Sequence, residues 1–172
     1  MKVMGIMGSP RLKSNTDRLL EAALEGARQS GAETEKVIVD KLKISPCREY
    51  YGCLKDGNCV IRDDMDDIYP KISEADAVII ASPIFFYGVS AQLKALIDRC
   101  QALWARKYIL KMPAGTQKKG AFIAVGATKG EKLFDGSVLT IKYFLKAINA
   151  GYDGELLIRG VDEKGQINKY PT

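Results

Sequence analysis

Short apolar runs alternate with helical patterns along most of the chain, and this alternation limits the fold more than any other feature. Five runs are short and bounded by turn residues, which is typical of buried strands. The run Asp76–Ala81 (DAVIIA) is apolar at every position after the first. Such strands occur where helices cover both faces of a parallel sheet. The expected strands are Lys2–Met7, Glu35–Val39, Asp76–Ala81, Gly120–Val125 and Tyr152–Ile158.

Apolar residues at helical spacing occupy the segments between these strands. We expect one helix from Thr16 to just before Gly31, another along the stripe from Val89 to Trp104, and a third from Val138 to Ile148. Successive strand–helix units predict an α/β fold with an open, doubly wound, five-stranded parallel sheet. The expected strand order is the flavodoxin-like 2-1-3-4-5, with helices on both faces and residues 1–172 in a single domain.

Composition and charge exclude several classes of function. The chain has no histidine, which removes His-based acid–base catalysis, His metal ligands and Ser-His or Cys-His nucleophiles. The net charge of +5 is spread along the chain without a basic run, so no nucleic-acid partner is expected. The apolar stretch at the N-terminus is too short for a signal peptide, and no run approaches a membrane span. A cytoplasmic protein is therefore predicted.

The loop after the first strand has the features of a phosphate site. It reads GSPRLKSNT from Gly8 to Thr16 and runs directly into a helix, whose first turn offers unpaired backbone N–H groups. Hydroxyl and amide side chains add donors, and an arginine adds a forked cation suited to phosphate oxygens. The alternative is that Ser14 only caps the helix, with Asp17 completing a capping box. The candidate residues are Ser9, Arg11, Ser14, Asn15 and Thr16.

Two further loops follow the third and fourth strands, at the same edge of the predicted sheet. The segment Ser82–Ser90 carries three aromatic residues and suits contact with a flat heterocycle. The alternative, that Phe85 and Phe86 belong to the core or to a dimer interface, is expected to hold for one of the two. The segment Gly126–Gly130 is rich in small residues that let the backbone approach a ligand closely.

These motifs together, GSPRLKSNT, SPIFFYGVSAQLKALIDR and VGATKGEKLF, resemble the NAD(P)H-dependent FMN reductase family, and its iron–sulfur flavoprotein branch most closely. The similarity runs from Met1 to about Ile158. It implies that FMN binds with its phosphate on the five residues of the first loop. Members are commonly dimers or tetramers, so a homodimer or homotetramer is expected. The residues implied for the ring are Pro83, Ile84, Phe85, Tyr87 and Gly88, with Ala127, Thr128 and Lys129 nearby.

The cysteines depart from the pattern of that branch, which has Pro-Cys-x-x-Cys-x-x-Cys followed by a fourth cysteine. Cys47, Cys53 and Cys59 match, but Tyr50 stands at the second cysteine position. A four-iron cluster normally needs four thiolates. We therefore predict no intact [4Fe–4S] cluster and keep the three matching cysteines as candidates for a residual iron–sulfur site. Cys100 lies on an apolar helix stripe and is expected to be a buried hydrophobe.

The working hypothesis is an oxidoreductase in which FMN takes electrons from NAD(P)H, its co-substrate, and passes them to an unidentified acceptor. No protein nucleophile is needed, because the cofactor carries the chemistry. Lys129 is a candidate for placing positive charge near the ring. Two alternatives remain open: an electron-transfer protein that does not oxidise a nicotinamide, and a redox sensor based on flavin or the loop thiols. We interpret Gly160–Thr172 as a surface tail or a subunit-contacting arm, and the acidic run Asp63–Asp67 as structural, favouring a helix N-terminus.

Overall fold

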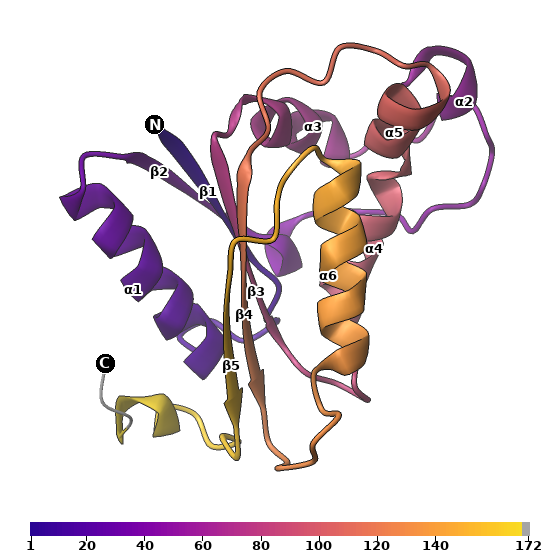
Figure 1. The fold of residues 1–172 in the computed structure, drawn as a ribbon. Helices are drawn as coiled ribbons and strands as arrows, with labels where there is room; N and C mark the ends of the chain where they lie inside the picture. The colour runs from indigo at the N-terminus through magenta and orange to yellow at the C-terminus, as the bar shows by residue number, and fades with distance from the viewer. Residues whose placement is uncertain (170–172) are drawn as a thin grey trace.

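The computed structural model describes residues 1–169 and contains one sheet of five parallel strands (Figure 1). The strand order β2-β1-β3-β4-β5 confirms the predicted 2-1-3-4-5 arrangement. Each pair of neighbouring strands runs in the same direction, so all carboxyl ends meet at one edge of the sheet. The strands are β1 (Lys2–Met7), β2 (Glu33–Ile38), β3 (Ala77–Pro83), β4 (Lys119–Gly126) and β5 (Gly154–Arg159).

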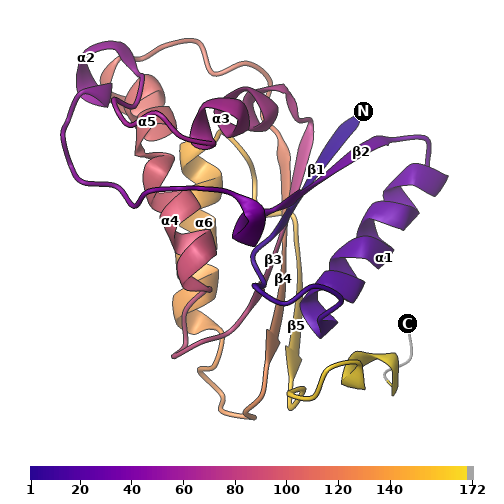
Figure 2. The ribbon, with the colours of Figure 1, turned by 180° about the vertical axis from the view of Figure 1, so that it is seen from behind.

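Helices cover both faces, as predicted, but they divide unequally between them. Figures 1 and 2 show α1 alone on one face, with α3, α4, α5 and α6 on the other. No helix within residues 1–169 is both long enough and apolar enough to cross a bilayer. The helices are α1 (Asn15–Gln29), α2 (Cys53–Asp56), α3 (Met65–Glu74), α4 (Ala91–Arg99), α5 (Gln101–Trp104) and α6 (Asp135–Ala147), with short turns η1 (Val39–Lys41), η2 (Ala105–Ile109) and η3 (Gln166–Lys169).

Alternation along β1 divides the core into two clusters. Met4 and Ile6 face the larger cluster under α3 to α6, whereas Val3 and Met7 face α1. Gly5 lets α1 approach the strand, because a Cβ there would lie 2.8 Å from Leu24 Cδ1. This close packing holds the first turn of α1 beside the carboxyl end of β1, where the first loop lies.

Some predicted helix boundaries were wrong, and at the start of α4 local capping is the reason. The helix expected from Val89 begins only at Ala91, because the Ser90 hydroxyl accepts a hydrogen bond from Leu93 N (3.2 Å) and caps it. This helix also ends at Arg99, and Cys100 forms the junction between α4 and α5. The third predicted helix starts earlier than its apolar stripe, at Asp135.

The segment after β5 folds back onto α1. The Asn15 side chain donates to Glu163 O (2.8 Å) and accepts from the backbone N–H groups of Gly165 (2.9 Å) and Ile167 (3.2 Å). Val161 and Ile167 are buried. Residues 160–169 therefore pack on their own chain, and the last part of the predicted tail, residues 170–172, lies outside the described residues.

Candidate functional site

The loops after β1, β3 and β4 meet at the carboxyl edge of the sheet. Gly8 N donates to Ala81 O (2.7 Å), and the Ser90 hydroxyl donates to Gly8 O, which joins the first loop to the second. Gly8 also has no room for a side chain, because a Cβ would lie 2.9 Å from Leu93 Cβ. The second loop reaches the third where Ile84 N donates to Val125 O (2.9 Å). The structure thus brings the three predicted loops together.

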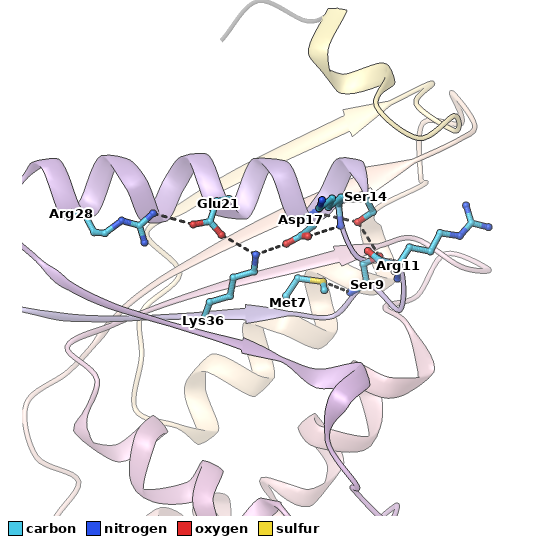
Figure 3. Close-up of polar contacts among 9 residues, drawn as sticks. Met7, Ser9, Arg11, Ser14, Asp17, Glu21, Arg28 and Lys36 are labelled. Atoms are coloured by element: carbon cyan, nitrogen blue, oxygen red, sulfur yellow. Dashed lines mark hydrogen bonds and ion pairs between the residues drawn. The ribbon is translucent and has the colours of Figure 1, made fainter.

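Serine hydroxyls hold the first loop in its shape (Figure 3). Ser9 Oγ accepts from Arg11 N (3.2 Å), and the Ser14 hydroxyl donates to Ser9 Oγ (3.1 Å). Ser14 Oγ also accepts from Asp17 N (3.2 Å), so the predicted N-cap is confirmed. The reciprocal half of the capping box was wrong, because the Asp17 carboxylate accepts instead from Lys13 N (2.7 Å). Lys13 adopts a left-handed conformation (φ 55°) that points its N–H at Asp17.

A cation from the neighbouring strand offsets the charge of Asp17. Lys36 of β2 pairs with Asp17 (2.5 Å) and Glu21 (2.8 Å), and Glu21 also pairs with Arg28 (3.0 Å) (Figure 3). Burial alone would lower the pKa of Lys36, but hydrogen bonds to the two carboxylates raise it overall. The helix N-terminus can therefore accept an anion without facing an uncompensated carboxylate.

The candidate residues of the first loop differ in their availability to a ligand. Ser9, Ser14 and Thr16 are buried within the loop, whereas Arg11 is exposed and extends away from the hydrogen-bonded network (Figure 3). The side chain of Asn15 is bonded to the segment after β5. The side-chain amide of Asn15 therefore anchors the segment after β5.

The second loop contains a tight reverse turn, Phe85–Gly88, whose two central residues are aromatic. Phe85 and Gly88 exchange both backbone hydrogen bonds (3.0 Å each), and Phe86 and Tyr87 between them have φ values of 48° and 63°. Bulky residues rarely adopt positive φ, so the turn stores backbone strain. Phe85 is 50% exposed and Phe86 is fully exposed, so neither is in the core. The expectation that one of them packs inside the molecule was wrong, and its interface part stays a prediction.

The third loop is exposed but held at both ends. Ala127, Thr128 and Lys129 are exposed, and Thr128 O accepts from Gly160 N (3.2 Å). The Arg159 guanidinium donates to Gly130 O (3.2 Å) and Glu131 O (3.0 Å). These contacts keep the loop beside Tyr87, whose hydroxyl would lie 3.5 Å from a Cβ at Gly130.

Sequence reasoning missed two serines that position these loops. Ser82 and Ser90 are fully buried, and Ser90 N donates to Ser82 Oγ (3.1 Å). The Ser90 hydroxyl also caps α4 and links the first and second loops. The position of Ser90 directly before a helical stripe could have identified it as a helix cap. Nothing in the sequence identifies Gly8 as the partner of its hydroxyl.

The three motif cysteines surround a second region, away from the carboxyl edge. Cys47, Cys53 and Cys59 are partly buried and line a cavity of about 640 Å³ that Cys100 also borders. Burial raises the pKa of Cys53, and electrostatic interaction with the neighbouring thiols of Cys59 and Cys47 adds to this rise. Burial raises the pKa of Cys100 to about 12, so its thiol stays neutral, in line with the predicted buried hydrophobe. Figure 1 shows α2, which begins at Cys53, at the opposite end of the molecule from the arrowheads of β4 and β5.

Arg99 clamps the two ends of the loop that carries these cysteines. Its guanidinium donates to Ser45 O (2.9 Å) before them, and to Ile61 O (3.1 Å) and the Asp63 carboxylate (2.6 Å) after them. The Arg99 side chain is wholly buried, and its Nε–H has no hydrogen-bond acceptor among residues 1–169. Asp63 has the predicted structural role at the start of α3, where its carboxylate accepts from Met65 N (3.1 Å), and it has this ion pair in addition.

The cysteine loop offers an incomplete set of ligands. Among the residues that the structure describes, no group of three or more Cys, Asp or Glu is arranged to hold a single metal ion. Tyr50, at the position where the motif has its second cysteine, is 61% exposed. A cluster held by four thiolates of this loop therefore does not fit these residues.

Proteins of similar sequence are known. The family of NADPH-dependent FMN reductases matches residues 1–148. An iron–sulfur flavoprotein from Methanosarcina thermophila is 40% identical over 129 residues, covering 75% of this chain and 65% of the relative. Another from Archaeoglobus fulgidus is 48% identical over 99 residues, covering 58% of this chain and 45% of the relative. The chain thus spans less than two thirds of these relatives.

A solved structure extends the likeness of fold. An NAD(P)H:quinone oxidoreductase from Methanothermobacter marburgensis superposes with a TM-score of 0.70 at 18% identity. The match covers 98% of this chain and 89% of that one. At this level of identity the match establishes a shared fold, that of a parallel sheet with helices on both faces.

Proposed function

Because the chain belongs to the NADPH-dependent FMN reductase family, we propose that its three carboxyl-edge loops bind FMN and that it is an oxidoreductase using NAD(P)H. The observation that carries this proposal is the first loop, where a capped helix N-terminus has its nearest carboxylate paired with Lys36. That arrangement suits a phosphate monoester. The aromatic turn and the small-residue loop stand on the same edge, where a ring attached to that phosphate would lie.

Bound FMN would supply the redox chemistry, accepting a hydride from NAD(P)H and yielding electrons to a second acceptor. The residues of this chain bind and orient it. The first-turn amides of α1 and the Arg11 guanidinium neutralise the phosphate, with Ser9, Ser14 and Thr16 beside them. Backbone groups of Pro83, Ile84 and Gly88 are placed to meet the polar edge of the ring.

Side chains at the rim complete the proposed site. Phe85 and Tyr87 offer aromatic surface against the ring, and Lys129, with Ala127 and Thr128, brings positive charge to its edge. The exposure of Phe85 and Phe86 supports a homodimer or homotetramer in which a second copy covers this turn. A cytoplasmic location is part of the same proposal.

The phosphate assignment is tested by replacing Arg11. Charge-assisted hydrogen bonds contribute about 1.5–3 kcal/mol, so Arg11→Ala should weaken FMN binding about 10- to 150-fold. Quenching of flavin fluorescence during titration measures this change. Arg62→Ala is the matched control, since Arg62 is exposed and its ion pair within residues 1–169 is with Asp66 on α3. Equal FMN affinity in the two variants would contradict the phosphate assignment.

A second candidate function is an electron-transfer protein without its own nicotinamide oxidation. The cysteine loop favours it, because the similar proteins of Methanosarcina thermophila and Archaeoglobus fulgidus are named iron–sulfur flavoproteins. Steady-state oxidation of NADH and NADPH by the FMN-loaded protein separates the two candidates. Turnover with a soluble acceptor supports the reductase, whereas FMN binding without turnover supports the carrier. The third candidate, a thiol redox sensor, requires that mild oxidation change the count of free thiols at Cys47, Cys53 and Cys59.

A further inference from the structure

A lysine is buried without a partner at the end of the sheet opposite the proposed flavin site. Lys118 lies directly before β4 and is only 7% exposed. Its backbone is fixed, because Lys118 N donates to Asn149 O (2.9 Å) and Lys118 O accepts from Gly151 N (2.9 Å). Within residues 1–169 its ammonium donates no hydrogen bond and forms no ion pair. Such a lysine is rare, since this residue type is almost never fully buried unless it is paired.

The ammonium of Lys118 borders a cavity of about 530 Å³. Within residues 1–169 the unpartnered side-chain atoms that are fully enclosed belong to Asp17 and Arg99, so Lys118 Nζ keeps access to the cavity. Small-molecule sites have volumes of about 300–1,000 Å³ and combine apolar walls with a few polar groups. The apolar wall residues here are Ile72, Leu103, Met112, Pro113, Ala147 and Ile148. Size and lining therefore suit an organic ligand.

Hydrogen bonds hold the cavity wall that the segment between η2 and β4 forms. The Asn149 side-chain amide donates to Ala114 O (3.2 Å) and Gly115 O (3.3 Å). At the start of the same segment, Met112 N donates to Arg106 O (2.8 Å). The cavity is thus formed without a ligand, which reduces the ordering that binding would require.

Positive charge dominates the lining of this cavity. Its cations are Lys118, Arg106 and Lys107, and among the lining residues, all of which the structure describes, Asp56 is the one acid. Arg106 and Lys107 donate to backbone carbonyls, at 2.8 and 2.9 Å. Burial lowers the pKa of Lys118, and attraction to Asp76 offsets only part of this change. A bound anion would compensate the buried ammonium for the water that it has lost.

We propose that this cavity binds a small monoanionic organic acid, whose carboxylate pairs with Lys118 and whose apolar body packs on the C-terminal ends of α3, α5 and α6. A carboxylate brings one negative charge to the one lining cation whose ammonium is unpartnered within residues 1–169. Both of its oxygens can accept from an ammonium with three donors. The apolar wall favours a carbon body over a free inorganic anion.

The acid site is separate from the flavin site. Lys118 stands at the amino end of β4, whereas the FMN loops follow the carboxyl ends of the strands; Figure 1 shows the segment that enters β4 at the end of the sheet opposite the arrowheads. The strand has 8 residues, so about 25 Å divides its two ends. The inference therefore goes beyond the proposed function and does not depend on it.

The test is a titration of the full chain, with and without FMN, with benzoate and with hexanoate as a flat and a flexible carboxylate. Calorimetry gives the affinity, and heteronuclear NMR locates the site. We expect binding in the millimolar range or tighter, with shifts at the amides of Gly115, Lys118 and Asn149. Benzamide, which has the shape of benzoate without its charge, should bind at least about 10-fold more weakly. Shifts confined to the loops after β1, β3 and β4, or no binding of either acid, would overturn the proposal.

Two variants assign the charge. Lys118→Met keeps much of the side-chain volume and should weaken carboxylate binding at least about 10-fold. Lys119→Met is the matched control, because Lys119 is exposed and pairs with Asp153, and it should bind like the wild type. Equal affinity in the wild type and Lys118→Met, or tighter binding of inorganic phosphate than of either acid, would contradict the assignment. The benzamide comparison on the wild type keeps the proposal falsifiable if Lys118→Met fails to fold, and titration without FMN keeps it separate from the flavin proposal.

Discussion

Removal of the Arg99 side chain tests how the cysteine loop is held. Arg99→Met keeps much of the aliphatic volume but deletes the donors to Ser45 O, Ile61 O and Asp63. The Arg99 side chain is wholly buried and that of Asp63 is 10% exposed, so the variant leaves a carboxylate in the interior without its cation. Breaking a buried pair in this way costs about 3–5 kcal/mol.

The remaining partners of Asp63 place the expected loss near the lower end of that range. Its carboxylate still accepts from Ser45 N (2.9 Å) and Met65 N (3.1 Å) in the variant. We therefore expect the free energy of unfolding to fall by about 3 kcal/mol, a large share of the 5–15 kcal/mol typical of a domain. Urea denaturation followed by far-ultraviolet circular dichroism at pH 7 measures the loss.

The pH dependence of stability gives an independent check. Burial would raise the pKa of Asp63, but the Arg99 guanidinium and the two backbone N–H groups lower it overall below its usual 3.8. A carboxyl with a lowered pKa stabilises the fold above its unfolded pKa, and this stabilisation is lost as pH falls through the folded value. The difference between wild type and Arg99→Met should therefore be largest near neutral pH and shrink below about pH 4.

The double variant with Asp63→Asn and a surface control complete the experiment. Arg62→Met removes only an exposed pair with Asp66 on α3 and should cost less than about 0.5 kcal/mol. Coupling between Arg99 and Asp63 should appear as strong non-additivity in the double variant. A loss under about 1 kcal/mol for Arg99→Met, or additive single losses, would refute the clamp as we describe it.

Three other changes follow from the structure. Lys118 is only 7% exposed and burial lowers its pKa, so its charge at neutral pH opposes folding, and the free energy of unfolding should rise as pH increases through the folded pKa. Lys118→Met should raise the free energy of unfolding by up to about 1 kcal/mol at pH 7. Lys119→Met, which changes an exposed side chain, should not raise it. Phe86 is fully exposed and has φ 48°, a conformation that Asn adopts more readily than Phe, so Phe86→Asn should raise the free energy of unfolding by about 0.5 kcal/mol in denaturant titration. A lower free energy of unfolding would show that the aromatic side chain has a partner within the chain. Burial raises the pKa of Cys100 to about 12, so iodoacetamide at pH 8 should modify three thiols in the folded protein and the fourth only after unfolding; rapid modification of all four would contradict that burial.

Much of the fold and of the first loop could be predicted because the relevant physics is local in the sequence. Apolar runs such as Asp76–Ala81 identify buried strands, and the order of strand–helix units leaves few parallel topologies. Ser14 is recognisable as a cap because its partner, Asp17 N, lies three residues away. The carboxyl-edge position of the three loops then follows from parallel strand direction alone.

The contacts that the sequence could not predict join distant segments. The side chain of Asn15 has the pattern of a phosphate ligand, yet its partners at Glu163, Gly165 and Ile167 lie about 150 residues away. The acidic run at Asp63 does stand at a helix N-terminus, but its further pairing with Arg99, on another helix, is not visible in the sequence. The partners of Asn15 and Asp63 cannot be predicted from sequence spacing, since many residues of the chain have the chemistry to bond each of them.

The sequence alone determined the parallel α/β architecture, the loops after β1, β3 and β4, and the loss of one motif cysteine to Tyr50. These properties reside in periodicity and in residue identity, which folding does not alter. Only the tertiary structure decided that Ser90 joins the first two loops, that Lys36 offsets Asp17, and that Arg99 clamps the cysteine loop beside a cavity. Each of these is a pairing of polar groups across long sequence separations, and burial selects the partner because an unpaired polar group in the interior is costly.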